Sequence, residues 1–143
     1  MVSTVPPGQA STGVAWLLRS LVERVPHVRG AVLLSSDGLT KSIHGLGPDE
    51  ADQLAAIASG FVALARSTGV RFGSSDRVRQ VVAELDDTVL FVSSAGLGSV
   101  LTVLAERDAD PGVVGYEMSQ LIKSVRPFLA TPARQAAHYP PKP

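Results

Sequence analysis

The sequence contains no cysteine. Without thiols, the chain cannot form disulfides, bind a metal through thiolates or use a thiol nucleophile. The first ten residues, MVSTVPPGQA, also lack the basic cluster and apolar stretch of a secretory signal. A reducing compartment is the simplest location for such a chain, and we therefore expect a cytoplasmic protein.

The chain also lacks an excess of charge of either sign. Its 13 Lys and Arg residues balance 13 Asp and Glu residues, and neither kind forms a long run. Bulk charge therefore gives no attraction to a nucleic acid backbone or an anionic membrane. No window approaches the roughly 18 continuous apolar residues of a membrane span. We expect a soluble chain that binds no nucleic acid and does not insert directly into a membrane.

Motifs for cofactor binding and catalysis are missing too. A phosphate-binding loop needs glycines and a lysine directly before a helix, and neither Lys41 nor Lys123 has that context. Gly96 and Gly98 are predicted to join two strands, whereas the glycines of a dinucleotide-binding loop open a helix. The histidines have no carboxylate or second histidine at metal-ligand spacing. We therefore predict no cofactor, no metal site and no catalytic residue.

Proline is scarce in the central part of the chain and frequent at its ends. Seven of the 10 prolines lie outside residues 12–126. Proline-rich ends of this kind favour disorder. We therefore predict a disordered leader over 1–11, one folded domain over 12–126 and a disordered, proline-rich tail over 127–143. A domain of this length is able to bury a core of its own.

Hydrophobic periodicity and turn residues predict eight elements within the domain. Apolar residues at helical spacing, with prolines at the boundaries, predict three helices, over 12–25, 48–69 and 111–125. Extended runs separated by turns rich in glycine and aspartate predict five strands, over 30–36, 39–44, 78–85, 88–95 and 99–106. The predicted order is α-β-β-α-β-β-β-α.

The fourth and fifth strands indicate how these elements are layered. In TVLFVSSA (88–95) and SVLTVLAE (99–106), both alternating faces are largely apolar, so both faces need cover. Short turns join neighbouring strands, which predicts a mainly antiparallel sheet of five strands. We therefore predict an α/β domain with helices on both sides of the sheet, in three layers.

The second helix has more apolar surface than one sheet requires. Its apolar half is predicted to cover the sheet, and consists of Ala51, Leu54, Ala55, Ile57, Ala58, Phe61, Val62, Leu64 and Ala65. The other half carries no charge between Gln53 and Arg66, and a row of mostly small residues follows helical spacing: Gln53, Ala56, Gly60, Ala63 and Ser67. A glycine in an exposed helix costs roughly 1 kcal/mol relative to alanine unless another backbone uses the space.

A second copy of the chain is the partner that this row favours, because two-fold contacts between identical surfaces are the commonest among soluble oligomers. The strand over 78–85 is expected at a sheet edge, where pairing with its own copy would extend the sheet. We predict a dimer interface at Gln53, Ala56, Gly60, Ala63, Ser67, Val78, Gln80 and Val82. The alternative is a helix that is merely rich in alanine on its solvent side.

Three stretches together resemble the Roadblock/dynein light chain family. They are VERVPHVRGAVLLSSDGL, DEADQLAAIASGFVALAR and AERDADPGVVGYEMSQLIKSV, and the resemblance spans about 12–126. Within this family, the stretches resemble most the bacterial branch found in conservon operons. In those operons it is encoded beside small Ras-like GTPases and a membrane sensor-kinase-like protein. It implies a three-layer α/β/α roadblock (profilin-like) fold.

The resemblance also implies a function. Such a protein is expected to be a homodimer with a continuous sheet and paired second helices, which binds a small Ras-like GTPase and alters its nucleotide cycle. Recruitment to the membrane would come through partners, and the family offers no catalytic residues to carry over. We name Arg66, Arg71, Arg77 and Arg79 as candidate partner-binding residues because they cluster near the expected dimer surface; salt bridges or solubility explain them as well.

Three classes of function remain. A non-enzymatic dimeric regulator or scaffold for a Ras-like GTPase is the leading hypothesis. A small-molecule sensor with the same α/β fold is the alternative, and it requires a cavity with converging polar groups. An enzyme ranks third, and it would require an acid or histidine with a perturbed pKa in a pocket.

Overall fold

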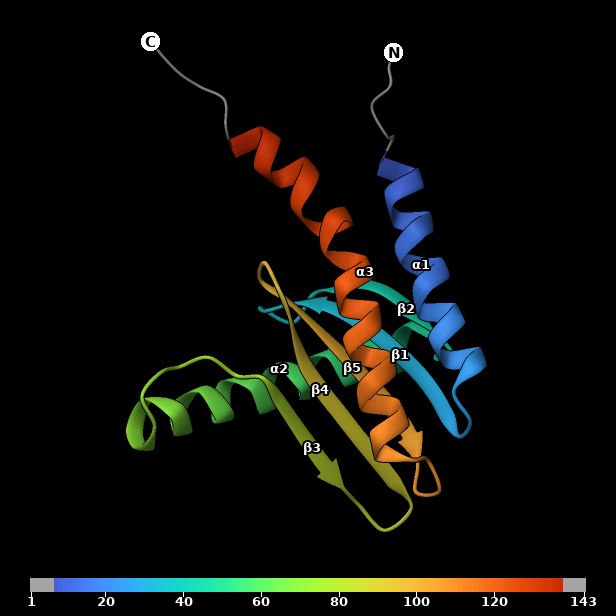
Figure 1. Ribbon diagram of the computed structural model, residues 1–143, viewed down its shortest axis with the longest axis vertical. Coiled ribbons are helices and arrows are strands. Elements are labelled where there is room, and N and C mark those ends of the chain that lie inside the picture. Colours follow the sequence, from blue (N-terminus) through green and yellow to red (C-terminus); the bar gives the residue numbers. More distant parts are fainter. Residues whose placement is uncertain (1–6, 138–143) are drawn as a thin grey trace.

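The computed structural model describes residues 7–137 of the chain, and the side chains of residues 13–129 (Figure 1). Its helices and strands follow the predicted order α-β-β-α-β-β-β-α. They are α1 (Pro7–Arg24), β1 (Val28–Ser35), β2 (Thr40–His44), α2 (Pro48–Phe72), β3 (Gln80–Glu84), β4 (Thr88–Gly96), β5 (Ser99–Glu106) and α3 (Pro111–Ala137).

The five strands form one sheet in the order β2-β1-β5-β4-β3. Every neighbouring pair is antiparallel, which confirms the predicted sheet. β5 lies at the centre, where Leu101 pairs with Leu33 of β1 and Val103 pairs with Phe91 of β4. β3 is an edge strand with a single neighbour, β4.

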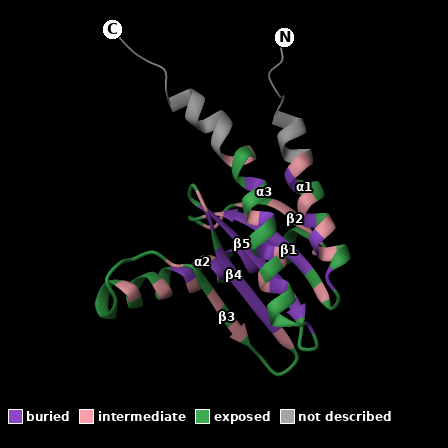
Figure 2. Ribbon diagram, in the orientation of Figure 1, coloured by how far each residue is buried: buried purple, intermediate pink, exposed green. Residues whose placement is uncertain are grey.

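Each face of the sheet is covered by helix, so the predicted three-layer α/β/α fold is also confirmed (Figure 1). On one face, Leu18 of α1 and Met118 of α3 pack with Phe91 of β4. On the other face, Leu54 of α2 packs with Val92 of β4. The central strands are therefore buried on both sides, as Figure 2 shows in purple.

A tight turn joins β1 to β2 at Asp37 and Gly38, as the sequence predicts. Gly38 has a φ of 93°, in the left-handed region that glycine adopts without a steric penalty. The Ser35 hydroxyl donates a hydrogen bond to the Asp37 carboxylate. This bond stabilises the charged form and holds the pKa of Asp37 below its ordinary value.

Both outer helices extend past the predicted domain limits. α1 begins at Pro7 and α3 continues to Ala137, through Pro127 and Pro132, where the sequence predicts disorder. The frequent prolines of this segment predict disorder, but the apolar stripe of α3 continues with Phe128 and Leu129, which pack against the core. Tertiary packing of this kind offsets the hydrogen bond that a helical proline lacks. Residues 1–6 and 138–143 of the predicted leader and tail lie outside the described residues.

The replacement Phe128→Ala tests the packing of this helical extension. The position of Gly13 shows how closely the two helices approach, since a Cβ on Gly13 would meet the Phe128 ring at 2.9 Å. Removing the ring is expected to lower the free energy of unfolding by about 1–3 kcal/mol, because the ring is half-buried. Urea denaturation measures the change. The matched control is Tyr116→Ala, which removes an exposed aromatic side chain from the same helix, and equal losses in both variants would contradict the packing.

The replacement Ser35→Ala is expected to raise the pKa of Asp37 toward its ordinary value of about 3.9. The folded-state pKa is the lower one, so the stabilisation by this bond is present above the unfolded pKa and disappears as the pH falls through the folded one. NMR titration of the Asp37 carboxyl carbon measures the shift. Ser36→Ala, which leaves the Ser35 hydroxyl in place, is the control. An unchanged Asp37 pKa in Ser35→Ala would show that the backbone donors alone hold it down.

Candidate functional site

α2 is longer than the sheet that it covers. It spans 25 residues, yet its buried side chains all lie between Ala51 and Val62. Beyond Val62 no residue of α2 is buried, and this second half projects past the edge of the sheet (Figure 1). A helix segment without cover from its own domain exposes whatever apolar side chains it carries.

The row of mostly small residues on α2 points away from the sheet. Its five members are all exposed: Gln53, Ala56, Gly60, Ala63 and Ser67. A Cβ added at Gly60 would meet no atom within 4 Å, so nothing in this chain uses the space that the glycine leaves. The row is thus open to another molecule.

Two larger side chains differ from their predicted positions. Ile57 and Leu64 were expected to cover the sheet, but their exposed fractions are 51% and 69%. They lie on the flank of the helix, which the sheet does not reach. Val70 and Phe72, in the projecting half, are exposed as well. We refer to Ala56, Ile57, Gly60, Ala63, Leu64 and Val70 together as the outer α2 surface.

The edge strand β3 adds a row of backbone groups beside α2. It pairs with β4 from Gln80, opposite Ser93, to Glu84, opposite Val89, and its other edge has no neighbour in the sheet. Gln80 and Val82 are exposed, and Val78, two residues before the strand, is half-buried against the core under α2. Unpaired edges of this kind are templates for pairing with another strand.

The four candidate arginines are all exposed but are not all neighbours. Arg66, Arg77 and Arg79 line one open cavity of about 1200 Å³. Arg71 instead lies with Arg66 at a separate shallow hollow of about 590 Å³ on the last turns of α2. The structure therefore brings three of the four together and leaves Arg71 apart.

The larger cavity also contains groups that the sequence did not indicate. Lys123 and Arg126 of α3 line it, together with Ser93 of β4 and Ser99 of β5. They come from three different elements, and no spacing along the chain brings them to one place. We refer to this cavity, with its cations Arg66, Arg77, Arg79, Lys123 and Arg126, as the basic cavity.

Other polar contacts lie away from these features. Within the described residues, the ion pairs are Arg24–Glu117 at 2.7 Å, His27–Glu106 at 3.3 Å and His44–Glu23 at 3.7 Å. In the same part of the chain, no three His, Asp or Glu side chains are grouped so that they could hold a metal ion. No helix described here is both long enough and apolar enough to cross a membrane.

Comparison with protein families and solved structures gives consistent matches. The family model "Roadblock/LC7 domain" matches residues 14–105. A crystal structure of a Roadblock/LC7 domain from Streptomyces avermitilis is 62% identical, with a TM-score of 0.80 over 82% of this chain and 98% of that chain. A second such domain from the same organism is 39% identical, with a TM-score of 0.65 over 78% and 96% of the two chains.

A more distant structure shares the architecture alone. It is MglB with a tetrameric arrangement, which is 17% identical, with a TM-score of 0.74 over 90% of this chain and 94% of that chain. At this identity the likeness shows the fold and no more. A search of the curated proteins finds no significant match.

Proposed function

The chain belongs to the Roadblock/LC7 domain family, and from this premise we propose that it is a non-enzymatic homodimer that regulates or scaffolds a small Ras-like GTPase. The family membership is shown by a match over residues 14–105 and by a relative that is 62% identical. The proposal adds the pairing of two copies and the identity of the partner. We place the protein in the cytoplasm, with access to the membrane through its partners.

The single observation that carries the pairing is the outer α2 surface. It exposes Ile57, Leu64 and Val70, with exposed fractions of 51%, 69% and 66%, on the same side as a glycine that no atom of the chain approaches. Apolar side chains gathered on one exposed surface mark sites of protein interaction. A copy of α2 packed against this surface would cover these side chains and use the gap at Gly60.

The edge of β3 supports the same geometry. In the proposed dimer, a two-fold axis beside α2 would also bring the two β3 strands toward one another, because β3 lies at the sheet edge past which α2 projects (Figure 1). Pairing of β3 with its copy would satisfy the free edge of each sheet and join the two sheets into one. The tetrameric arrangement of MglB supports self-association of this architecture.

The proposal that the partner is a small GTPase rests on membership of the family. We propose that the dimer binds the GTPase through the exposed arginines near the pairing surface, Arg66, Arg71, Arg77 and Arg79. Guanidinium groups bind carboxylates and phosphates in bidentate fashion, so they suit a partner that carries a nucleotide. Binding of this kind would modulate the nucleotide cycle, and a membrane sensor-kinase-like protein would be a further partner.

The replacement Ala56→Glu tests the pairing. It places a charge within the outer α2 surface, where close packing of a second copy would leave the carboxylate buried and unpaired. We expect the variant to remain folded but to be a monomer, with a dissociation constant raised at least about a hundredfold. Light scattering coupled to gel filtration measures the mass, and circular dichroism verifies the fold. Gln120→Glu adds the same charge to the exposed side of α3 and should remain a dimer. A dimeric Ala56→Glu variant would exclude this surface from the interface.

The replacement Gly60→Ala tests whether a second helix packs closely against Gly60 or whether the glycine has no role in pairing. In an isolated helix it should stabilise the chain by about 1 kcal/mol, since alanine is the better helix former and the position is open. Against a closely packed second helix the added methyl group should instead weaken the dimer by about tenfold or more. Analytical ultracentrifugation over a range of concentrations measures this. Tighter dimerisation of Gly60→Ala would contradict a close approach at this position.

Co-purification tests the partner. The protein, immobilised through its carboxyl end, is incubated with the small GTPase encoded nearest to it, loaded with either GDP or a non-hydrolysable GTP analogue. We expect retention that depends on the nucleotide, and weaker retention by the variant with Arg66, Arg71, Arg77 and Arg79 replaced by Gln. Absence of retention in both nucleotide states would refute the proposed partner while leaving the dimer untouched.

A further inference from the structure

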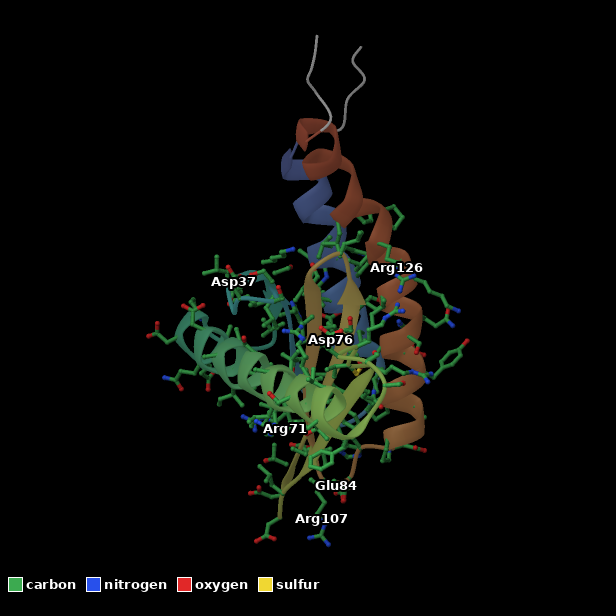
Figure 3. All side chains as sticks on the ribbon, turned by 90° about the vertical axis from the view of Figure 1, so that its left-hand side faces the viewer. Asp37, Arg71, Asp76, Glu84, Arg107 and Arg126 are labelled. Atoms are coloured by element: carbon green, nitrogen blue, oxygen red, sulfur yellow. The ribbon has the colours of Figure 1, made fainter. Side chains whose placement is uncertain are left out.

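The basic cavity is built where four segments meet. Its walls come from α2, from the connection between α2 and β3, from the turn between β4 and β5, and from α3. Figure 3 views this side of the molecule, with Asp76 labelled on the connection and Arg126 on α3. Because α2 and α3 cover opposite faces of the sheet, the cavity lies at the end of the sheet, where β4 continues beyond the start of β3.

Positive charge in the cavity is almost uncompensated. Five cationic side chains line it, and Asp76 is the one acidic residue among the lining residues that the structure describes. None of the five cations makes an ion pair within the described part of the chain. The whole chain is neutral, so this concentration of positive charge is matched by acids elsewhere. Four of these acids lie at the opposite end of the sheet, at Asp86, Asp87, Glu106 and Asp108.

Hydroxyl groups in the cavity are poised as donors. Lys41 donates a hydrogen bond to the Ser99 hydroxyl oxygen at 2.8 Å, and Gln80 donates to the Ser93 oxygen at 3.2 Å. Each serine thus accepts a bond and keeps its own hydrogen free to donate. The exposed fractions of Ser93 and Ser99 are 6% and 2%, so these donors lie at the floor and not at the rim.

Arg126 lies beside the β4–β5 turn. A Cβ built at Gly96 would be 3.5 Å from Arg126 Nε, an ordinary van der Waals distance, so the guanidinium is in contact range of this turn. Lys123 lies one turn earlier on α3 and faces the same cavity. These two cations belong to the face of the molecule opposite to α2.

We propose that the basic cavity binds a free small molecule that carries a phosphate or diphosphate group. Arginine forks, an ammonium group and buried hydroxyl donors are together suited to an anion with several acceptor oxygens around one centre. A volume of about 1200 Å³ admits such a group with a further organic part attached. A protein surface laid across the mouth would contact the arginines but would not reach the hydroxyls at the floor.

This site goes beyond the proposed pairing and partner. It shares Arg66, Arg77 and Arg79 with the proposed partner-binding residues, whereas Lys123 and Arg126 belong to the cavity alone. Arg126 and Lys123 are on α3, whereas the pairing surface is on α2. Variants at these two positions therefore leave the pairing surface unaltered. Loss of anion binding in them cannot be ascribed to loss of the dimer, and a wild-type protein that proves monomeric would not by itself remove the site.

The test is a titration of the full chain, labelled with ¹⁵N, with sodium pyrophosphate and separately with inorganic phosphate, at ionic strength fixed by sodium chloride. We expect saturable amide shifts around Ser94–Val100 and 75–80, with pyrophosphate bound more tightly than phosphate. The variant Arg126→Gln should bind pyrophosphate at least about tenfold more weakly, and the double variant with Lys123→Gln more weakly still. Arg107→Gln, which removes the same charge at the acidic end of the sheet (Figure 3), should bind as the wild type does.

Three results would overturn the proposal. The first is a set of shifts that follow ionic strength alone and do not saturate, which is general screening. The second is an equal loss of affinity in Arg107→Gln and Arg126→Gln. The third is sedimentation with phosphatidylglycerol vesicles without binding of free pyrophosphate, which would identify a lipid headgroup on a membrane surface instead of a free ligand. Light scattering on Arg126→Gln should give the same mass as the wild type, which shows that the replacement does not alter self-association.

Discussion

Burial of β4 and β5 on both faces is the constraint from which the rest of the structure follows. Phe91 and Leu101 are directed to one side and Val92 to the other, and each side must be covered by helix. α1 and α3 together cover one face, while α2 alone covers the other. β3 is covered on the α2 side alone, where Val81 and Ala83 pack against the core, whereas Val82 on its other face is exposed. The strand order leaves β3 at one edge of the sheet, and α2 projects past the same edge (Figure 1).

The sequence predicts most of this fold because alternation and helical spacing are local signals. The predictions that fail concern side chains whose burial depends on how far one element extends over another. Ile57 and Leu64 fit the apolar pattern of α2, yet the sheet ends before it reaches their flank. Phe128 belongs to the segment predicted to be a disordered tail, yet its ring packs against α1. Lys123 and Arg126 lie near the β4–β5 turn only because of the tertiary fold. The sequence around neither residue indicates this proximity.

Charge segregation relates the two proposed activities. A neutral chain with evenly scattered charges would present neither a basic cavity nor an acidic end, whereas this chain has five cations around the basic cavity and a group of acids near the start of β4. Arg66 belongs both to the cavity and to the hollow on α2 beside the outer α2 surface. An anion in the cavity would therefore change the field at the surface proposed for pairing and for the GTPase. Occupancy of one site would then be felt at the other through charge, without any movement of the backbone.

The extension of α1 and α3 has a practical consequence. The first turns of α1 and the last turns of α3 lie at the same pole of the molecule, away from α2 and β3 (Figure 1). A fluorescent protein or affinity handle fused to either end would leave the outer α2 surface unobstructed.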